Sequence, residues 1–202
     1  MSPPRLAPEP TCLRTRAWAD YALLDSGGGK KLERYGRFTV VRPEPQCWWA
    51  PRLDPTTWEK ADAVFDPADE EDAGRWRFAR TPPESFALAW NQVRFHARFT
   101  AFRHLGFFPE QASHWAWLRD AAAAKAPQSP QPKILNLFGY TGVATLVMAA
   151  AGALVTHVVA SKKAIGWARD NATLSGLRDR PVRWICDDAR KYLAREARRG
   201  VR

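Results

Sequence analysis

Hydrophobic residues in the last third of the chain follow two alternating patterns. Short apolar runs are typical of buried strands, and each run precedes a segment in which apolar residues recur every three or four positions, as in a helix. The predicted strands cover residues 134–138, 155–159 and 182–186, and the predicted helices cover residues 142–151, 162–175 and 188–199. Glycines at positions 176 and 200 end the last two helices. Three strand–helix units in succession predict a parallel sheet with right-handed crossovers.

The chain before residue 119 is instead aromatic and strand-prone. Its predicted strands, bounded by glycine and proline turns, cover residues 37–42, 76–80, 86–90 and 93–103. In the last of these, apolar residues from Val93 onward alternate with polar residues such as Arg94 and Arg98, which predicts one buried face and one basic, solvated face. The seven acidic residues from Glu59 to Asp72 are interpreted as a solvated connection.

A helix is predicted between these two parts. Pro109 suits the first turn, and the helix continues to about Lys125 with Trp115 and Leu118 as apolar anchors. Residues 126–131, with the sequence APQSPQ, have the composition of a linker.

The predicted fold class is therefore α/β, with a Rossmann-like parallel sheet of three βα units preceded by a smaller, mostly-β N-terminal domain. The predicted parts are a β-rich accessory or substrate domain at 1–118, a helix end and linker at 119–132, and the sheet domain at 133–202. A doubly wound sheet normally has more strands, and half of one leaves a strand edge unpaired. We therefore expect the sequence to be the front part of a longer protein.

Composition and charge favour a soluble protein with a polyanionic partner. The 202 residues are 46% hydrophobic and 26% charged, as in ordinary globular chains, and 31 basic against 21 acidic residues give a net charge of +10. Such an excess attracts nucleic acid first of all. The three cysteines form no CxxC pair, so we expect reduced thiols in a cytoplasmic protein, with neither a zinc knuckle nor a disulfide framework.

One uncharged stretch is long enough to cross a bilayer. Residues 134–160 are 27 residues without Asp, Glu, Lys or Arg. The stretch nevertheless contains polar residues and three glycines, and its apolar pattern changes along its length, which favours strand, turn, helix, turn and strand. The N-terminus also lacks the apolar region of a signal peptide. No membrane association is predicted.

Two glycine-containing turns differ from the known phosphate-binding motifs. The turn after the first predicted βα strand reads G-Y-T-G from Gly139 to Gly142, which differs from the GxGxxG fingerprint and disfavours a nicotinamide or flavin oxidoreductase. Its glycines would still allow a ligand to approach the backbone at the carboxyl edge of the sheet. The loop from Gly27 to Lys31 lacks the P-loop spacing and is interpreted as a hairpin turn.

Several motifs in the second part, taken in order, resemble a known family. Phe138-Gly-Tyr-Thr-Gly142 is followed by AAAGA at 149–153, by Val155-Thr-His157, by ASKKAI at 160–165 and by WICDDA at 184–189. Their order and spacing resemble the class I S-adenosylmethionine-dependent methyltransferases of the bacterial 23S rRNA methyltransferase group. Upstream, residues 104–111 resemble the segment that covers the cofactor in that group, and residues 23–34 resemble the front end of one subgroup.

The resemblance implies a binding site for S-adenosylmethionine. The turn formed by Phe138, Gly139, Tyr140, Thr141 and Gly142 would lie under the methionine portion and the ribose. Ser161 would lie near the adenosine, Asp188, with Asp187 beside it, would accept a hydrogen bond from the adenine amino group, and Gln111 would approach from the preceding helix. Simpler roles stay open: Ser161 and the two aspartates could cap helices, and Phe138 and Tyr140 could be core aromatics.

The sequence departs from the family pattern at two places. The family ends its second strand with an acid that holds the ribose hydroxyls, and Val159 occupies that position here. Loss of a charged acceptor costs about 1.5–3 kcal/mol, so we expect weaker cofactor binding. The Asp-Pro-Pro segment that follows a fourth strand in the family does not occur in these 202 residues. The catalytic residues therefore remain unknown.

The resemblance implies a methyltransferase acting on RNA, with a ribosomal RNA base as its substrate.

Basic residues of the last predicted helix, including Arg190 and Arg198, accompany an expected apolar stripe of Ala189, Leu193 and Ala197. The basic face is either simply solvated or in contact with phosphates. The alternative is a non-catalytic RNA-binding protein that kept the fold, which Val159 would suit. The sequence predicts no metal and does not specify an oligomeric state.

Overall fold

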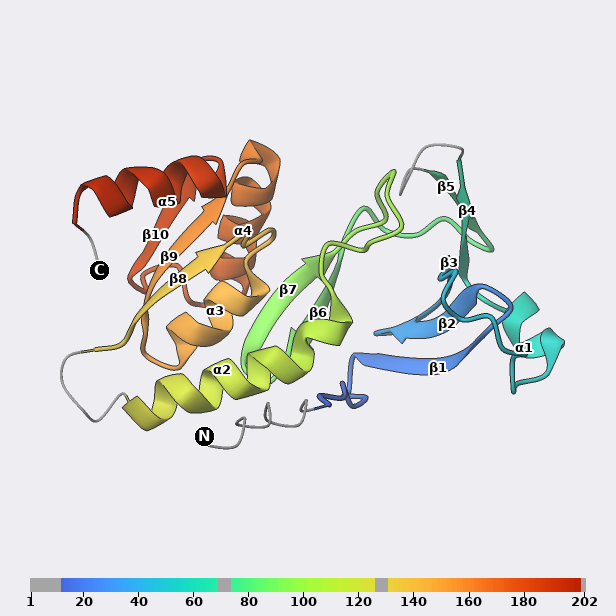
Figure 1. Ribbon diagram of the computed structural model, residues 1–202. Helices are drawn as coiled ribbons and strands as arrows, with labels where there is room; N and C mark the ends of the chain where they lie inside the picture. Colours follow the sequence, from blue (N-terminus) through green and yellow to red (C-terminus); the bar gives the residue numbers. More distant parts are fainter. Residues whose placement is uncertain (1–11, 69–73, 126–130, 201–202) are drawn as a thin grey trace, which may run out of the picture.

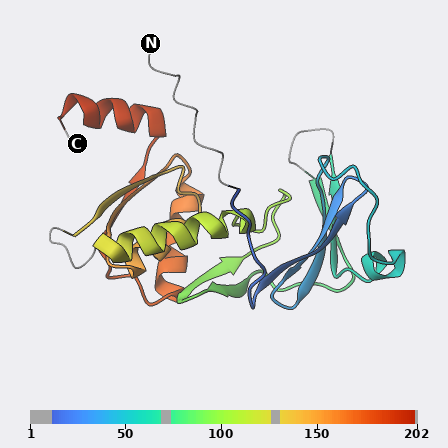
Figure 2. The same cartoon turned by 60° about the horizontal axis from the view of Figure 1, so that its bottom comes forward.

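The computed structural model describes residues 12–68, 74–125 and 131–200. An antiparallel-rich sheet built from the N-terminal residues lies at one end of the molecule, and a parallel sheet with helices lies at the other (Figure 1). A two-stranded hairpin and a long helix join them, as the turned view in Figure 2 also shows. The predicted α/β class, with a mostly-β N-terminal part ahead of a three-stranded parallel sheet, is confirmed.

The N-terminal sheet has the strand order β1-β2-β3-β4-β5, and only the β3–β4 pair is parallel. Its strands are β1 (Tyr21–Gly27), β2 (Lys30–Tyr35), β3 (Phe38–Pro43), β4 (Ala63–Pro67) and β5 (Gly74–Phe78), with a short helix α1 (Pro55–Glu59) before β4. The hairpin interpretation of the glycine loop is confirmed, because Gly27 pairs with Lys30 across the β1–β2 turn.

Three of these five strands were missed by the hydrophobic pattern. β1 and β2 carry polar residues at buried positions, and β4 lies inside the acidic run that was interpreted as a solvated connection. That interpretation is wrong for residues 63–67, because Phe65 is buried and Asp66 is paired with Arg77 of β5. Acidic residues 69–72 lie outside the described residues.

The joining elements are β6 (Phe86–Trp90), β7 (Val93–Ala97), a 3-10 turn η1 (Pro109–Gln111) and α2 (Ala112–Lys125). The predicted helix is confirmed, whereas the predicted strand over 93–103 ends at Ala97. Beyond it the chain turns back, and Arg98 packs its guanidinium 4.7 Å from the Trp167 ring centre and lies 3.6 Å from Asp170. Arg98 is thus part of an interface between elements and does not extend a solvated strand face. The predicted linker at 126–131 lies outside the described residues except for Gln131.

The parallel sheet has the order β10-β9-β8 and matches the predicted strand–helix alternation to within a few residues. It contains β8 (Lys133–Leu137), α3 (Val143–Ala150), β9 (Leu154–Val159), α4 (Lys162–Leu174), β10 (Val182–Cys186) and α5 (Ala189–Arg198). The uncharged stretch 134–160 divides into β8, α3 and β9. Within the described residues there is no helix whose length and apolar character would suit a bilayer span.

Helices lie on both faces of this sheet. Val155 and His157 of β9 face α3, and because neighbouring strand residues point to opposite faces, Thr156 faces the side on which α5 lies (Figure 1). α5 packs through Ala189, Tyr192 and Glu196.

The predicted apolar stripe of α5 is therefore only partly correct. Leu193 is 41% exposed and Ala197 is also exposed, and both line a groove of about 720 Å³ beside the sheet. Leu135 of β8, which was expected to be buried, is 44% exposed in the same groove.

One hydrophobic core joins the two ends of the molecule. Tyr35 and Val40 of the N-terminal sheet belong to the same buried cluster as Phe95 of β7, Trp115 of α2 and Leu146 of α3. Tyr35 meets Phe107 edge to face, with ring centres 5.7 Å apart, and Phe107 packs on Phe95 at 4.7 Å. The segment that leads into α2 is thus buried between the N-terminal sheet and the hairpin.

Candidate functional site

The turn between β8 and α3 has an unusual backbone. Phe138 and Tyr140 both have positive φ angles, of 54° and 48°, and Gly142 has φ of 84°. Such angles cost a residue with a side chain about 1–3 kcal/mol and are concentrated at binding and catalytic sites. Hydrogen bonds hold the turn in place, with the Gly139 amide donating to the Val158 carbonyl at 3.0 Å and the Gly142 amide to the Gly139 carbonyl at 2.9 Å.

Both glycines of the turn are required by close packing. A Cβ at Gly139 would overlap ring atoms of His157, and a Cβ at Gly142 would lie 2.9 Å from the Cβ of Ala168 on α4, in addition to the strain of its positive φ. The turn is therefore pressed against β9 on one side and against α4 on the other. Its backbone lies at the carboxyl edge of the parallel sheet, where α/β proteins bind ligands.

His157 supports this turn from below and was not singled out by sequence reasoning. It is fully buried on β9, its Nδ1 lies 2.9 Å from the Thr145 hydroxyl, and that hydroxyl accepts a hydrogen bond from the Asn136 amide at 2.8 Å. Burial lowers the pKa of His157 to about 4, so the ring is neutral near pH 7. A lone histidine in an otherwise apolar strand, opposite a glycine turn, is the sequence signal that could have identified it.

A cavity of about 320 Å³ opens above the turn and beneath η1 and α2. Phe138, Gly139, Tyr140 and Thr141 line it from the turn and Gln111 lines it from η1, whereas Gly142 does not line it. Gln111 Oε1 lies 2.9 Å from His114 Nδ1, at the same wall. The larger groove beside α5 contains none of the predicted cofactor residues.

The two aromatic residues of the turn differ in exposure and packing. Phe138 is 74% exposed, so the interpretation of this residue as a core aromatic is wrong. Tyr140 lies between Phe108 and Trp167, with ring centres 5.6 and 6.4 Å apart, and burial raises the pKa of its hydroxyl.

The remaining predicted residues lie at the ends of the next two strands. Ser161 caps α4 by accepting the Ala164 amide at 3.2 Å, and Asp188 caps α5 by accepting the Lys191 amide at 2.9 Å, so both capping roles are present. Asp187 accepts a hydrogen bond from Arg195 at 2.7 Å, which lowers the pKa of its carboxyl. Ser161, Asp187 and Asp188 do not line the 320 Å³ cavity.

Val159 ends β9 between these groups. Its side chain is half-buried, and its carbonyl accepts the Asp187 amide at 3.2 Å. Asp170 does not replace the expected acid, because it lies beside Arg98. Among the described residues, no group of three or more His, Cys, Asp or Glu is arranged to hold a metal ion.

No protein-family model matches the chain, but individual proteins do. A solved S-adenosylmethionine-dependent methyltransferase from Agrobacterium tumefaciens is 52% identical, with a TM-score of 0.87 over 95% of this chain and 60% of that one. The ribosomal RNA large subunit methyltransferase K/L of Syntrophotalea carbinolica is 31% identical over 114 residues, and that of Pseudomonas paraeruginosa is 30% identical over 133 residues. These alignments cover 56% and 61% of this chain.

A further structural match shows the fold alone. A methyltransferase solved in complex with S-adenosylhomocysteine has a TM-score of 0.69 at 17% identity, over 90% of this chain and 49% of that one. The chain spans 15% and 17% of the length of the two curated relatives and 60% of the Agrobacterium protein. The family resemblance drawn from the sequence motifs is confirmed over that part of the relatives.

Proposed function

Because the chain is related to the S-adenosylmethionine-dependent methyltransferases, and among them to the bacterial 23S rRNA methyltransferases K/L, we propose that it binds S-adenosylmethionine at the turn from Phe138 to Gly142. We propose further that it supplies the cofactor-binding part of an enzyme that methylates RNA, at a ribosomal RNA base.

The observation that carries the proposal is the strained glycine turn under a cavity. The positive φ angles of Phe138 and Tyr140 have an energetic cost that a purely structural βα turn does not require. Gly139 lines the cavity, and because His157 and Ala168 leave no room for a Cβ at either glycine, the backbone of the turn is held close against β9 and α4. A cavity of about 320 Å³ lined by aromatic rings and a few amide groups suits a small, partly polar molecule.

The proposed roles follow the position of each residue. Gly139 to Thr141 would contact the methionine portion and ribose, and Gln111 would close the cavity from above. Ser161, Asp187 and Asp188, at the ends of β9 and β10, would lie toward the adenosine. Residues 133–202 would then form the cofactor-binding part, joined through 119–132 to an accessory or substrate domain at 1–118.

When bound, S-adenosylmethionine supplies an activated methyl group on a sulfonium sulfur. This chain's residues would hold the cofactor in one orientation and exclude water from it, which is how proximity contributes to catalysis. The exposed ring of Phe138, beside the cavity, is placed to contact whatever approaches the cofactor.

The RNA part of the proposal is supported by charge and by the relatives' substrates. The net charge is +10, and Arg190, Lys191 and Arg198 lie exposed on α5. Contacts to phosphates release counterions, so binding should weaken steeply as salt increases. Replacing both Arg190 and Lys191 by Gln should lower the salt slope by about 2 if both contact phosphates, at about 1 per contact.

Calorimetric titration of the purified chain with S-adenosylhomocysteine tests the cofactor site. We expect saturable binding and a rise in Tm with ligand concentration. The second candidate, a non-catalytic RNA-binding protein, is favoured by Val159. It predicts salt-dependent RNA binding with neither heat of binding nor a Tm shift for S-adenosylhomocysteine, and that result would refute the cofactor proposal.

A further inference from the structure

A buried ion pair lies inside the N-terminal sheet, far from the turn in sequence. Glu33 of β2 is 1% exposed and Arg42 of β3 is 5% exposed. Arg42 donates from Nε and Nη2 to the two carboxylate oxygens of Glu33 at 2.7 and 2.8 Å. The hydroxyls of Tyr21 and Tyr35 donate to the same carboxylate at 2.9 and 3.1 Å, and Arg42 keeps the pKa of Glu33 below its usual value. The carboxylate is thus saturated with donors.

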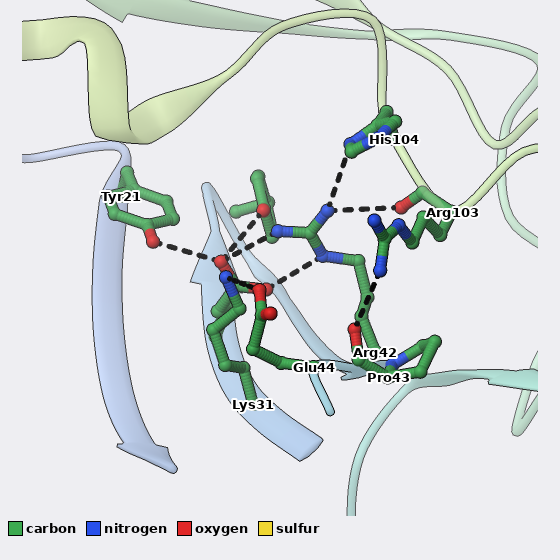
Figure 3. A network of polar contacts seen from close by, with 9 residues as sticks. Tyr21, Lys31, Arg42, Pro43, Glu44, Arg103 and His104 are labelled. Atoms are coloured by element: carbon green, nitrogen blue, oxygen red, sulfur yellow. Dashed lines mark hydrogen bonds and ion pairs between the residues drawn. The ribbon is translucent and has the colours of Figure 1, made fainter. Parts of the chain in front are cut away.

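The third guanidinium nitrogen of Arg42, Nη1, is not bound to Glu33 and contacts residues outside the sheet. Nη1 donates to the carbonyl of Arg103 at 3.2 Å and lies 3.5 Å from Nδ1 of His104 (Figure 3). Arg103 in turn donates to the carbonyl of Pro43, the residue after Arg42, at 3.4 Å. Hydrogen bonds in both directions therefore join the segment at Arg42 and Pro43 to the segment at Arg103.

The segment that starts at Arg103 extends to the turn formed by residues 138–142 and contacts it. His104 packs on Phe108 with ring centres 4.6 Å apart, and Phe108 packs on Tyr140 at 5.6 Å. The Thr141 hydroxyl donates to the carbonyl of Gly106. Residues 103–108 thus contact Arg42 at one end, whereas Gly106 and Phe108 contact Thr141 and Tyr140 of the strained turn.

We propose that Glu33 and Arg42 are positioning residues for the cofactor turn and act through residues 103–108. Arg42 fixes where this segment leaves the N-terminal sheet, and the segment then holds Tyr140 and Thr141 in the conformation that lines the cavity. Glu33 fixes the rotamer of Arg42 by binding two of its nitrogens, which directs the third toward Arg103. The part of this inference that concerns cofactor affinity rests on the proposed function.

The alternative is that the pair only stabilises the sheet in which it lies. A buried ion pair can often be replaced by apolar residues of similar volume without loss of stability, whereas removal of one partner leaves a buried charge. The double variant Glu33→Leu with Arg42→Met therefore removes the contact to Arg103 while it avoids an unpaired charge. Arg42→Lys keeps a charge for Glu33 but lacks the fork that reaches both partners at once.

Asp25→Asn is the matched control. Asp25 is 8% exposed in the same sheet and accepts the amides of Ser26, Arg52 and Leu53 at 2.8–3.0 Å, on the side of β1 that is joined to the loop before α1. Its loss should weaken the sheet without touching residues 103–108. The unfolding midpoint of each variant is measured so that variants of equal stability are compared.

Hydrogen–deuterium exchange of the unliganded chain gives the first readout. We expect faster exchange at residues 104–108 and 138–142 in the double variant and in Arg42→Lys, and wild-type exchange there in Asp25→Asn. Unchanged exchange in the double variant, or an equal rise in Asp25→Asn, would overturn the inference.

Titration with S-adenosylhomocysteine gives the second readout. We expect affinity to fall by about 5-fold or more in the double variant and to stay at the wild-type value in Asp25→Asn. If the affinity for S-adenosylhomocysteine falls in proportion to the loss of stability in all three variants, the positioning role is refuted. If the wild-type chain binds no S-adenosylhomocysteine while the exchange pattern is as expected, the proposed function fails and the coupling of Arg42 to the turn stands.

Discussion

Gly139 lies directly against the imidazole ring of His157, and there is no room between them for a side chain at position 139. The contact joins the turn between β8 and α3 to β9, the central strand of the parallel sheet. His157 is itself fully buried, and its Nδ1 is held by the Thr145 hydroxyl. The height of the turn above the sheet is therefore set by this pair.

Gly139→Ala is expected to destabilise the protein and to weaken ligand binding. Overpacking of this kind costs about 1–3 kcal/mol, and chemical denaturation measures it. Gly166→Ala is the control, since Gly166 lies in α4 with open space around its Cα and should stabilise the protein by about 0.5–1 kcal/mol. In a His157→Ala background the penalty of Gly139→Ala should shrink; an unchanged penalty would show that the ring is not what excludes the methyl group.

The buried histidine makes stability depend on pH. Burial lowers the folded-state pKa of His157 to about 4 from 6.5, so between these values the unfolded chain binds a proton that the folded chain does not. The contribution of neutral His157 to stability is therefore fully present above about pH 6.5. It is lost as the pH falls toward 4, by at most about 3 kcal/mol. Urea unfolding of wild type and His157→Gln at several pH values measures this loss.

The control for that experiment is His114→Gln, because His114 is exposed. It should keep the wild-type pH dependence, whereas His157→Gln should flatten it between pH 6.5 and 4. Parallel curves for all three proteins would mean that other groups account for the acid sensitivity.

The parallel sheet could be predicted from the sequence because its signals are local. Val182–Cys186 was predicted with its observed bounds, and the helices end within a residue or two of the expected positions. A strand followed by a glycine turn and a helix produces a change of period that needs no knowledge of distant partners. The clustering of Gln111 with the turn followed from family resemblance, which supplied the distant contact.

Three strands of the N-terminal sheet, β1, β2 and β4, could not be predicted because charged residues interrupt their hydrophobic pattern. Glu33 of β2 and Arg42 of β3 are almost fully buried and satisfy each other. Asp66 contacts Arg77 across β4 and β5 at the surface of the sheet. A pattern of hydrophobic positions contains no information about which charges will meet, so the strands that supply the acids of these pairs, β2 and β4, are missed.

Val159→Asp is expected to tighten cofactor binding. An acid at the end of β9 would offer the ribose hydroxyls a charged acceptor, worth about 1.5–3 kcal/mol, or roughly 10- to 150-fold in Kd. Val159→Asn, a neutral acceptor of the same size, should give a smaller gain. Calorimetry with S-adenosylhomocysteine compares the three proteins, and equal affinities would rule out this position as the ribose contact.

The buried face of α5 differs from the expected apolar stripe, and it reverses which truncation should cost more stability. Tyr192 is 3% exposed and packs toward the sheet, while Leu193 is 41% exposed at the groove. Truncation of a large buried aromatic costs about 3–5 kcal/mol, so Tyr192→Ala should lower the free energy of unfolding by several times more than Leu193→Ala. The burial of Glu196 on this face is compensated by Arg199, at 3.1 Å, and by Arg183 of β10, at 4.0 Å. Glu196→Leu should therefore change the free energy of unfolding little. A larger loss of this free energy for Leu193→Ala than for Tyr192→Ala would mean that the helix packs by its Leu193 face.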